Sequence, residues 1–557
     1  MENFVFEGGM KGYFHYLCAN YTITTMAETI IKSLRDSKTA RWSALILTSI
    51  AMLFAYMFIS IFGPLQTILE VQLRWTPDIF GEVASAAYVL NVFGLLLLAG
   101  FILDRIGVRN TALVSGTIML VGAGITAYGT SATFNDGGFG YAFLNSFWTS
   151  LPPSAKMSLI GFAIFGSGLE MAVITAVKAI TKWFRGKELA LAMALQVSVA
   201  RLGTTSILIF APRWAEYFGI TAAIAIGALL LIISLISFIV YFMMDKKLDS
   251  QLGEANESDD PFRLKDIGKV LTSKGFWLLA LFCVLYYSAV FPFQTYAVNM
   301  MQSNLSFREL PADCFWASRG AVMVGFFAVL GVAIFSFSSN FSKKNLKTSL
   351  LACAAIMFFV FCYISYMRQS ASVIISTFPL IAIGLTPLLG NYIDRKGKSV
   401  SMLILGALLL VVCHLSFAFI LPQVGGYYTM GIATAFLITF VLGVSFSLVP
   451  ASLWPLVPKL IDNNVLGSAY ALIMWVQNIG LWFVPIAIGR ILMASNTFIA
   501  EKVASGIITA EEAAVMYDYT NPLLMLAAFG IASLIFALIL KREDKMKGHG
   551  LELPNVK

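Results

Sequence analysis

Long runs of apolar residues, each close to the length that crosses a bilayer, alternate along the chain with short polar segments. A helix needs about 20 consecutive, mainly apolar residues to cross the hydrocarbon core. By this measure the first half of the chain predicts six spans and the second half eight. The predicted spans lie near residues 42–65, 79–102, 110–130, 157–181, 188–211, 219–243, 275–299, 317–338, 347–367, 371–391, 399–421, 428–452, 467–492 and 520–540.

Composition and charge agree with a membrane protein. The chain is 59% hydrophobic and only 12% charged, and its mean hydropathy is +0.81, outside the range of soluble globular domains. The net charge of +8 does not indicate a nucleic-acid partner, because the basic residues lie in short segments between the apolar runs. If the amino terminus is cytoplasmic, the positive-inside rule accounts for these segments. They lie at 35–41, 104–109, 182–187, 246–274, 343–347, 395–398 and 541–547.

One short charged motif occurs twice, each time between two apolar runs. The first copy is Gly100, Asp104, Arg105, Gly107 and Arg109, and the second is Gly390, Asp394, Arg395, Gly397 and Lys398. Two such copies indicate two related helical bundles. With this motif the chain resembles the major facilitator superfamily, which implies two six-helix bundles and a cytoplasmic gate at the motif.

The two aspartates of the motif are the candidate gate residues. We expect Asp104 and Asp394 to hold the gate by pairing with basic residues or with a neighbouring helix terminus. The alternative is simple positive-inside anchoring, which accounts for Arg105 and Arg395 but not for the acids beside them.

The second copy of the motif follows the fourth span of its half, whereas the superfamily pattern places it after the second. The surplus near 317–367 therefore indicates an inserted helical hairpin, giving 14 spans in all; a partly re-entrant segment is the alternative. We predict a cytoplasmic N-terminal segment, an N-terminal bundle, a cytoplasmic linker, a C-terminal bundle with the hairpin, and a cytoplasmic tail. Their bounds are 1–41, 42–244, 245–273, 274–541 and 542–557.

Ionisable side chains inside the spans are the candidate functional groups, since each costs ~2.5–3.5 kcal/mol at a helix centre. Glu170 lies in the middle of the fourth predicted span and Arg201 in the middle of the fifth. By helical spacing Ser198, Thr204 and Thr205 share a face with Arg201, so we expect this stripe to line a wet cavity. A structural ion pair between Glu170 and Arg201 is the alternative to a substrate site near the midplane.

Two further sets of residues are candidates for the cavity wall. Tyr287 and Gln294 align with Phe291 on the first span of the second half, and Trp475 and Asn478 align on the penultimate span. Helical spacing of aromatic residues is also what packing alone produces, so packing is the alternative for both sets.

No cofactor, metal or catalytic group is predicted. The cysteines and the three histidines are too scattered for a metal site. Gly397-Lys398-Ser399 resembles the end of a phosphate-binding loop, but Tyr392 stands where that loop needs its first glycine. We therefore expect neither ATP-driven transport nor an enzyme.

Several segments narrow the resemblance to one branch of the superfamily. They are Trp183–Leu189, Gln196, Ala200–Gly203, Ser452–Pro458, Leu466–Tyr470 and Gln477-Asn478. These are similar to the branch called major facilitator superfamily domain-containing protein 1, whose members are lysosomal dipeptide uniporters. That resemblance implies that Glu170 and Arg201 recognise the two charged ends of a peptide. It does not extend to the first 40 residues or to the extra hairpin.

The sequence thus predicts a transporter that moves a small charged solute, foremost a dipeptide-like zwitterion, by alternating access. A proton-coupled symporter of another organic anion or zwitterion is one alternative, and a non-transporting membrane sensor or scaffold is another. The sequence says nothing of an accessory subunit. Because neither tail shows an acidic dileucine signal, the expected location is a bacterial inner membrane, with the lysosomal membrane as the alternative.

Overall fold

The computed structural model describes residues 34–185, 187–252, 268, 270–307, 370–461 and 465–554. Within these residues all regular structure is helical, and 12 helices are long and apolar enough to cross a membrane. This confirms the predicted all-α class. The predicted hairpin at 317–367 lies outside the described residues, so the total of 14 spans stays a prediction.

The helices fall into two bundles of six spans each. The first contains α2 (Lys38–Ile59), α4 (Pro77–Leu90), α5 (Leu96–Gly129), α8 (Pro153–Phe184), α9 (Leu189–Phe218) and α10 (Ile220–Leu252). The second contains α12 (Lys274–Asn304), α15 (Ala371–Lys396), α16 (Ser399–Leu415), α18 (Tyr428–Leu453), α20 (Leu466–Ser495) and α23 (Thr520–Lys547). The second span combines α4, the π-helical turn η3 (Asn91–Leu95) and the start of α5, and α5 turns into the third span at Gly107, where φ is +81°.

The first helix of each bundle begins in the same way. The Ser37 hydroxyl accepts a hydrogen bond from the Ala40 N–H at the start of α2, and the Ser273 hydroxyl accepts one from the Phe276 N–H at the start of α12. A serine in this position satisfies one of the free N–H groups of the first turn.

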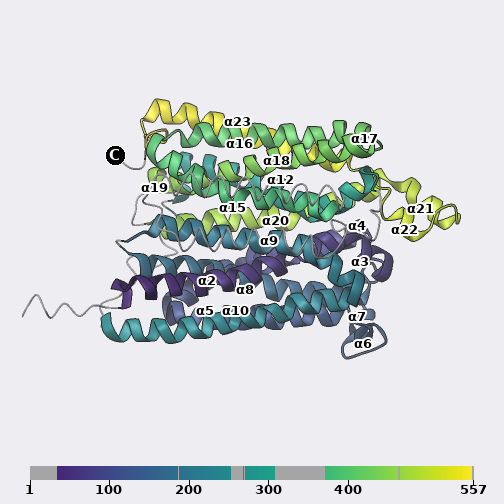
Figure 1. Ribbon diagram of the computed structural model, residues 1–557, viewed down its shortest axis with the longest axis horizontal. Coiled ribbons are helices and arrows are strands. Elements are labelled where there is room, and N and C mark those ends of the chain that lie inside the picture. Colours follow the sequence, from purple (N-terminus) through teal and green to yellow (C-terminus); the bar gives the residue numbers. More distant parts are fainter. Residues whose placement is uncertain are drawn as a thin grey trace, which may run out of the picture.

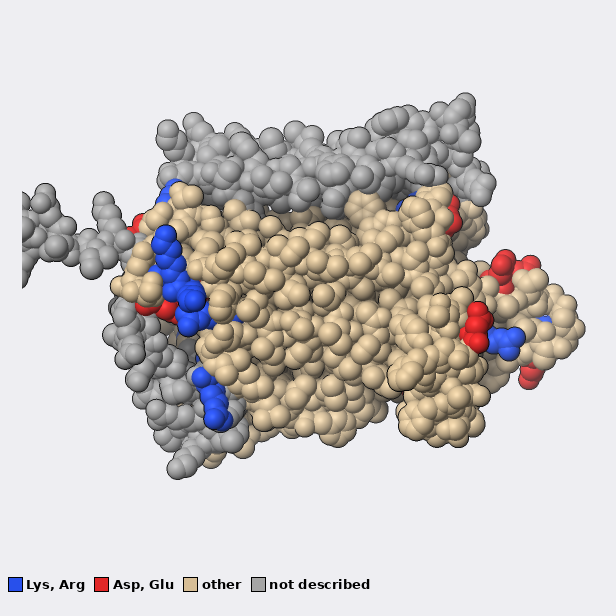
Figure 2. All heavy atoms as spheres, turned by 90° about the horizontal axis from the view of Figure 1, so that it is seen from below, with Lys and Arg blue, Asp and Glu red and all other residues tan. Residues whose placement is uncertain are grey.

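The two bundles lie side by side, with their helices roughly parallel (Figure 1). They meet along two helix pairs, α4 with α20 and α9 with α15. Charged side chains gather at the two ends of the molecule and leave an uncharged band between them (Figure 2). We call the end where α2 begins and α23 finishes the cytoplasmic end, because the basic residues concentrate there, and the opposite end the outer end.

At the cytoplasmic end, ion pairs connect the helices of the first bundle. Lys182 on α8 contacts Asp245 at 2.7 Å and Asp249 at 2.5 Å, and Arg109 of the first motif contacts Asp249 at 2.9 Å. The Trp183 indole N–H also donates to Asp245, which is 1% exposed. Asp245 and Asp249 both lie on α10. This helix continues to Leu252 and so extends past residue 245, the predicted start of the linker.

The second motif meets the C-terminal tail. The Gly397 φ of +72° ends α15, and the Lys398 N–H donates to the Glu552 carbonyl at 2.9 Å. The Glu552 carboxylate accepts from the Ser401 N–H and hydroxyl at 3.0 and 2.8 Å, which places it at the start of α16. We call residues 548–554 the tail strap. Asp394 lies near Lys459, within the same bundle; the gate role of both aspartates, and the residue bounds of the domains, stay predictions.

Candidate substrate site

Glu170 and Arg201 lie near the middle of α8 and α9, and both retain solvent-accessible surface. A charged side chain at that depth can keep contact with water only if a cavity reaches it, because lipid cannot solvate it. The accompanying stripe is less open than predicted. Ser198, Thr204 and Thr205 are 6%, 2% and 2% exposed.

Two hydroxyls of this stripe, those of Ser198 and Thr205, donate to backbone carbonyls. The Ser198 hydroxyl lies 3.0 Å from the Ile383 carbonyl of α15, in the other bundle, and the Thr205 hydroxyl donates to the Arg201 carbonyl at 3.0 Å. The stripe therefore helps to pack α9, and Arg201 is its one half-buried member.

Aromatic rings surround the Arg201 guanidinium. Its carbon lies 4.3 Å from the centroid of Phe446, 5.4 Å from that of Phe291 and 6.0 Å from that of Tyr56. A cation within about 6 Å of an aromatic face is attracted by the ring quadrupole. Phe446 and Phe291 belong to the second bundle and Tyr56 to the first, so Arg201 lies at the boundary between the bundles.

Glu170 has a different set of neighbours. Asn478 of the second bundle faces its carboxylate, and Tyr56 and Tyr88 of the first bundle are close enough for electrostatic interaction. Among the described ion pairs none joins Glu170 to Arg201, although both residues are described. The structural ion pair considered from the sequence is therefore not formed here.

The other predicted residues divide into two groups. Tyr287 lies beside Arg201 and stacks on Phe291 at 5.5 Å, and Asn478 lies beside Glu170 with an amide oxygen that is buried and without a hydrogen-bond partner. Tyr287 and Asn478 therefore belong to the site around Glu170 and Arg201. Trp475 instead donates its indole N–H to the Val92 carbonyl at 2.9 Å, a contact between the bundles. Gln294 is 7% exposed, and no described contact connects it to either charge.

Sequence reasoning did not find Tyr56, Tyr88 or Phe446. Each is one of several aromatic residues in its apolar span, and the chain is 13% aromatic, so residue type gave no signal. Their role depends on which helices face each other.

Hydrogen bonds between the bundles close the outer end. The Tyr296 hydroxyl on α12 lies 2.9 Å from the Pro77 carbonyl of the first bundle and 3.0 Å from the Pro485 carbonyl of α20. The Asn299 amide donates to the Thr67 hydroxyl of the first bundle at 2.9 Å, and Tyr517 hydrogen-bonds to Glu70. The structure is thus closed on its outer side.

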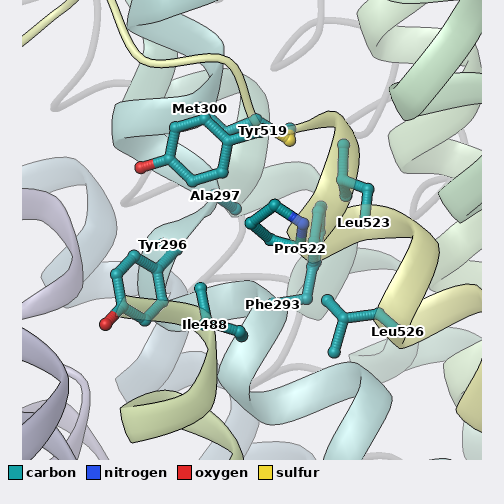
Figure 3. Close-up of a pocket in the computed structure, with 9 residues that line it drawn as sticks. All are labelled: Phe293, Tyr296, Ala297, Met300, Ile488, Tyr519, Pro522, Leu523 and Leu526. Carbon is teal, nitrogen blue, oxygen red and sulfur yellow. The ribbon is translucent and has the colours of Figure 1, made fainter. Parts of the chain in front are cut away.

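A separate apolar pocket lies inside the second bundle, near this closure (Figure 3). Its cavity is small, about 10 Å³, and neither Glu170 nor Arg201 lines it. Its walls come from α12, α20, α23 and the residue before α23: Phe293, Tyr296, Ala297, Met300, Ile488, Tyr519, Pro522, Leu523 and Leu526. Over the residues described, no group of His, Cys, Asp and Glu side chains could hold a metal ion.

Comparison with known proteins gives one family match. The model of the Major Facilitator Superfamily matches residues 48–378. The curated relatives include the lysosomal dipeptide transporter MFSD1 of Danio rerio, 27% identical over 72% of this chain and 69% of that protein. The human protein of the same name is 25% identical over 72% of this chain and 68% of its own length.

Solved structures agree on the fold. The nucleoside transporter NupG superposes with a TM-score of 0.57 at 14% identity, covering 90% of this chain and 99% of that one. A bacterial homologue of the human drug peptide transporters PepT1 and PepT2 superposes with a TM-score of 0.54 at 13% identity, covering 91% and 99%. Identities this low show the shared fold alone.

Proposed function

Because the chain belongs to the Major Facilitator Superfamily and is a membrane transporter, we propose that its cargo is a dipeptide-like zwitterion anchored by Glu170 and Arg201. The observation that carries the proposal is that these two residues of opposite charge lie half-buried in mid-span without pairing with each other. A zwitterion supplies the missing partner of each. The name of the curated relatives, lysosomal dipeptide transporter, supports the same cargo.

Each anchor suits one end of a peptide. The guanidinium offers parallel N–H donors that match a carboxylate in two-point geometry. The Glu170 carboxylate and the unpartnered Asn478 oxygen are acceptors, so together they can receive the N–H groups of a cargo ammonium. Alternating access then follows from opening the outer contacts while the cytoplasmic side closes around this site.

Transport by purified protein in vesicles tests the cargo. We expect Arg201→Lys to lower the uptake of a dipeptide about 10- to 150-fold, which corresponds to losing ~1.5–3 kcal/mol for a hydrogen bond to a charged group. Glu170→Gln should weaken a free dipeptide more than its N-acetylated form, because only the free peptide carries an ammonium.

Two controls on α9, the helix that carries Arg201, have the same chemical changes. Arg213 and Glu216 pair with each other at 2.9 Å near the outer end of α9, so Arg213→Lys and Glu216→Gln should leave uptake nearly unchanged. Full peptide binding by a stable Glu170→Gln/Arg201→Gln double variant would overturn the proposal. Uptake of organic anions that needs a proton gradient, with no uptake of peptides, would favour the proton-coupled alternative.

The proposed location is a bacterial inner membrane. The lysosomal membrane, named for the curated relatives, is the alternative. Expression of a fluorescently tagged chain, followed by membrane fractionation, distinguishes the two.

A further inference from the structure

Arg201, the cationic residue of the site, contacts aromatic rings of the opposite bundle. Arg201 belongs to α9 in the first bundle, whereas Phe446 and Phe291, the two rings nearest to its guanidinium, belong to α18 and α12 in the second. The 4.3 Å approach of Phe446 is well within the range of a cation–π contact.

The Phe446 ring is itself fixed by packing. It is 0% exposed, and its centroid lies 4.9 Å from that of Phe378 on α15 and 5.7 Å from that of Phe291. Phe291 in turn stacks on Tyr287 at 5.5 Å. Arg201 therefore contacts rings from two helices of the second bundle, α12 and α18, and Phe378 of α15 supports one of these rings.

We infer that Phe446, with Phe291, is a positioning residue for Arg201 that makes the affinity for the cargo carboxylate depend on how the two bundles are arranged. Rings that occupy the face of a guanidinium leave its edge free, and the edge carries the N–H groups that bind a carboxylate in two-point geometry. That the ligand is a carboxylate rests on the proposed function. The contact between the bundles is observed in the structure and does not rest on the proposed function.

The consequence for transport follows from the positions of the partners. If the bundles rock around the site, α9 moves relative to α18, and the ring leaves the guanidinium. A cargo that binds Arg201 better when Phe446 contacts it shifts the population toward the state with that contact, by as much as its affinities for the two states differ. In this structure the contact is present and the outer end is closed.

The first test compares two peptides. We expect Phe446→Leu to raise KM about 5- to 30-fold for a dipeptide with a free carboxylate and to leave KM unchanged for the same dipeptide with an amidated carboxyl end. Phe446→Tyr keeps the ring and should restore KM. The control is Phe417→Leu, since Phe417 is equally buried and stacks on Phe293 at 5.1 Å elsewhere in the second bundle. An equal change for both peptides would mean that Phe446 has only a structural role, and would overturn the inference.

The second test needs no cargo. Spin labels at Phe139→Cys and Ile507→Cys, in a background without other cysteines, report the separation of the outer ends of the two bundles; both positions are strongly exposed, at 91% and 69%. Phe446→Leu should raise the outer-open population, and Phe446→Tyr should not. Unchanged distances between the two labels in Phe446→Leu would show that Phe446 does not affect the arrangement of the bundles, and would overturn the inference. If the wild type moves no peptide, the proposed function fails, and this second test still decides whether Phe446 affects the arrangement of the bundles. If Phe446→Leu does not fold, Phe291→Leu takes its place in both tests.

Discussion

At the scale of single residues, the site depends on groups that leave part of their bonding capacity unused. Asn478 donates to the Met474 carbonyl of its own helix, but its oxygen has no partner. Buried polar atoms of this kind are costly unless a partner arrives. In a transporter the cargo can be that partner, which is why the unpaired oxygen beside Glu170 supports a binding role.

Tyr296 carries a prediction at this scale. Its hydroxyl lies between two backbone carbonyls, one on each bundle, so Tyr296→Phe removes a hydrogen bond and leaves the packing of the ring in place. A hydrogen bond of this kind contributes ~1 kcal/mol, equivalent to about a fivefold change in an equilibrium constant. Glu82 of α4 pairs with Arg490 of α20 at 3.4 Å near this contact, so the reference is Glu82→Cys alone. On that background we expect Tyr296→Phe to make the cysteine react about fivefold faster with a membrane-impermeant reagent added outside. No acceleration would show that other contacts hold the outer end closed.

At the scale of secondary-structure elements, the tail strap joins three parts of the second bundle. Glu552 binds the start of α16, Lys541 of α23 lies 3.8 Å from its carboxylate, and Lys459 donates to the Leu553 carbonyl at 2.7 Å. Leu551 is 0% exposed and anchors the strap in the apolar core. The carboxylate also lies where the partial positive charge of the α16 N-terminus favours an anion.

Neutralising Glu552 should release the strap. We expect Glu552→Gln to lower the free energy of unfolding by about 1 kcal/mol, since the carboxylate is partly exposed and its contacts are screened. Cleavage by trypsin after Lys545 or Lys547 should become faster. Glu501→Gln, at an exposed position on the outer helix α21 (Thr497–Ala504), is the matched control and should change neither quantity. A strap that stays protected in Glu552→Gln would mean that Leu551 and the contacts of Lys459 and Lys398 to the strap backbone hold it without the carboxylate.

At the scale of the whole molecule, the bundles touch where one helix backbone lies against another. A Cβ atom added at Gly489 of α20 would lie 2.2 Å from the Pro77 carbonyl of α4. This is a contact between bundles, so a side chain there obstructs the closed arrangement without disturbing the interior of either bundle.

Gly489→Ala should therefore open the outer end. We expect a larger separation of the outer spin labels at Phe139 and Ile507, and slower net transport, because the outer-closed state becomes less populated. Thermal stability should fall little. Gly124→Ala, where an added Cβ meets no atom within 4 Å, is the control and should leave both measurements unchanged. Loss of folding in Gly489→Ala would show instead that the bundles fold as one unit.

Much of this architecture follows from the one-dimensional pattern. Apolar runs fix the described spans because every backbone polar group in a bilayer must be satisfied inside a helix. The repeat of the charged motif indicates two bundles, and the cost of placing Glu170 and Arg201 in mid-span marks them as functional candidates. Each of these inferences uses only the local sequence and the difference between water and lipid as surroundings, and the lengths of the apolar runs show which residues lie in lipid.

The partners of these residues were decided only by the tertiary structure. Phe446 meets Arg201 across 245 residues of sequence, and Asn478 meets Glu170 across the same boundary between bundles. Spacing along a helix defines a face, but it does not say which helix lies opposite. That is why the sequence left the Glu170–Arg201 ion pair open as an alternative, whereas packing of the two bundles gives each charge separate neighbours and leaves both accessible to solvent.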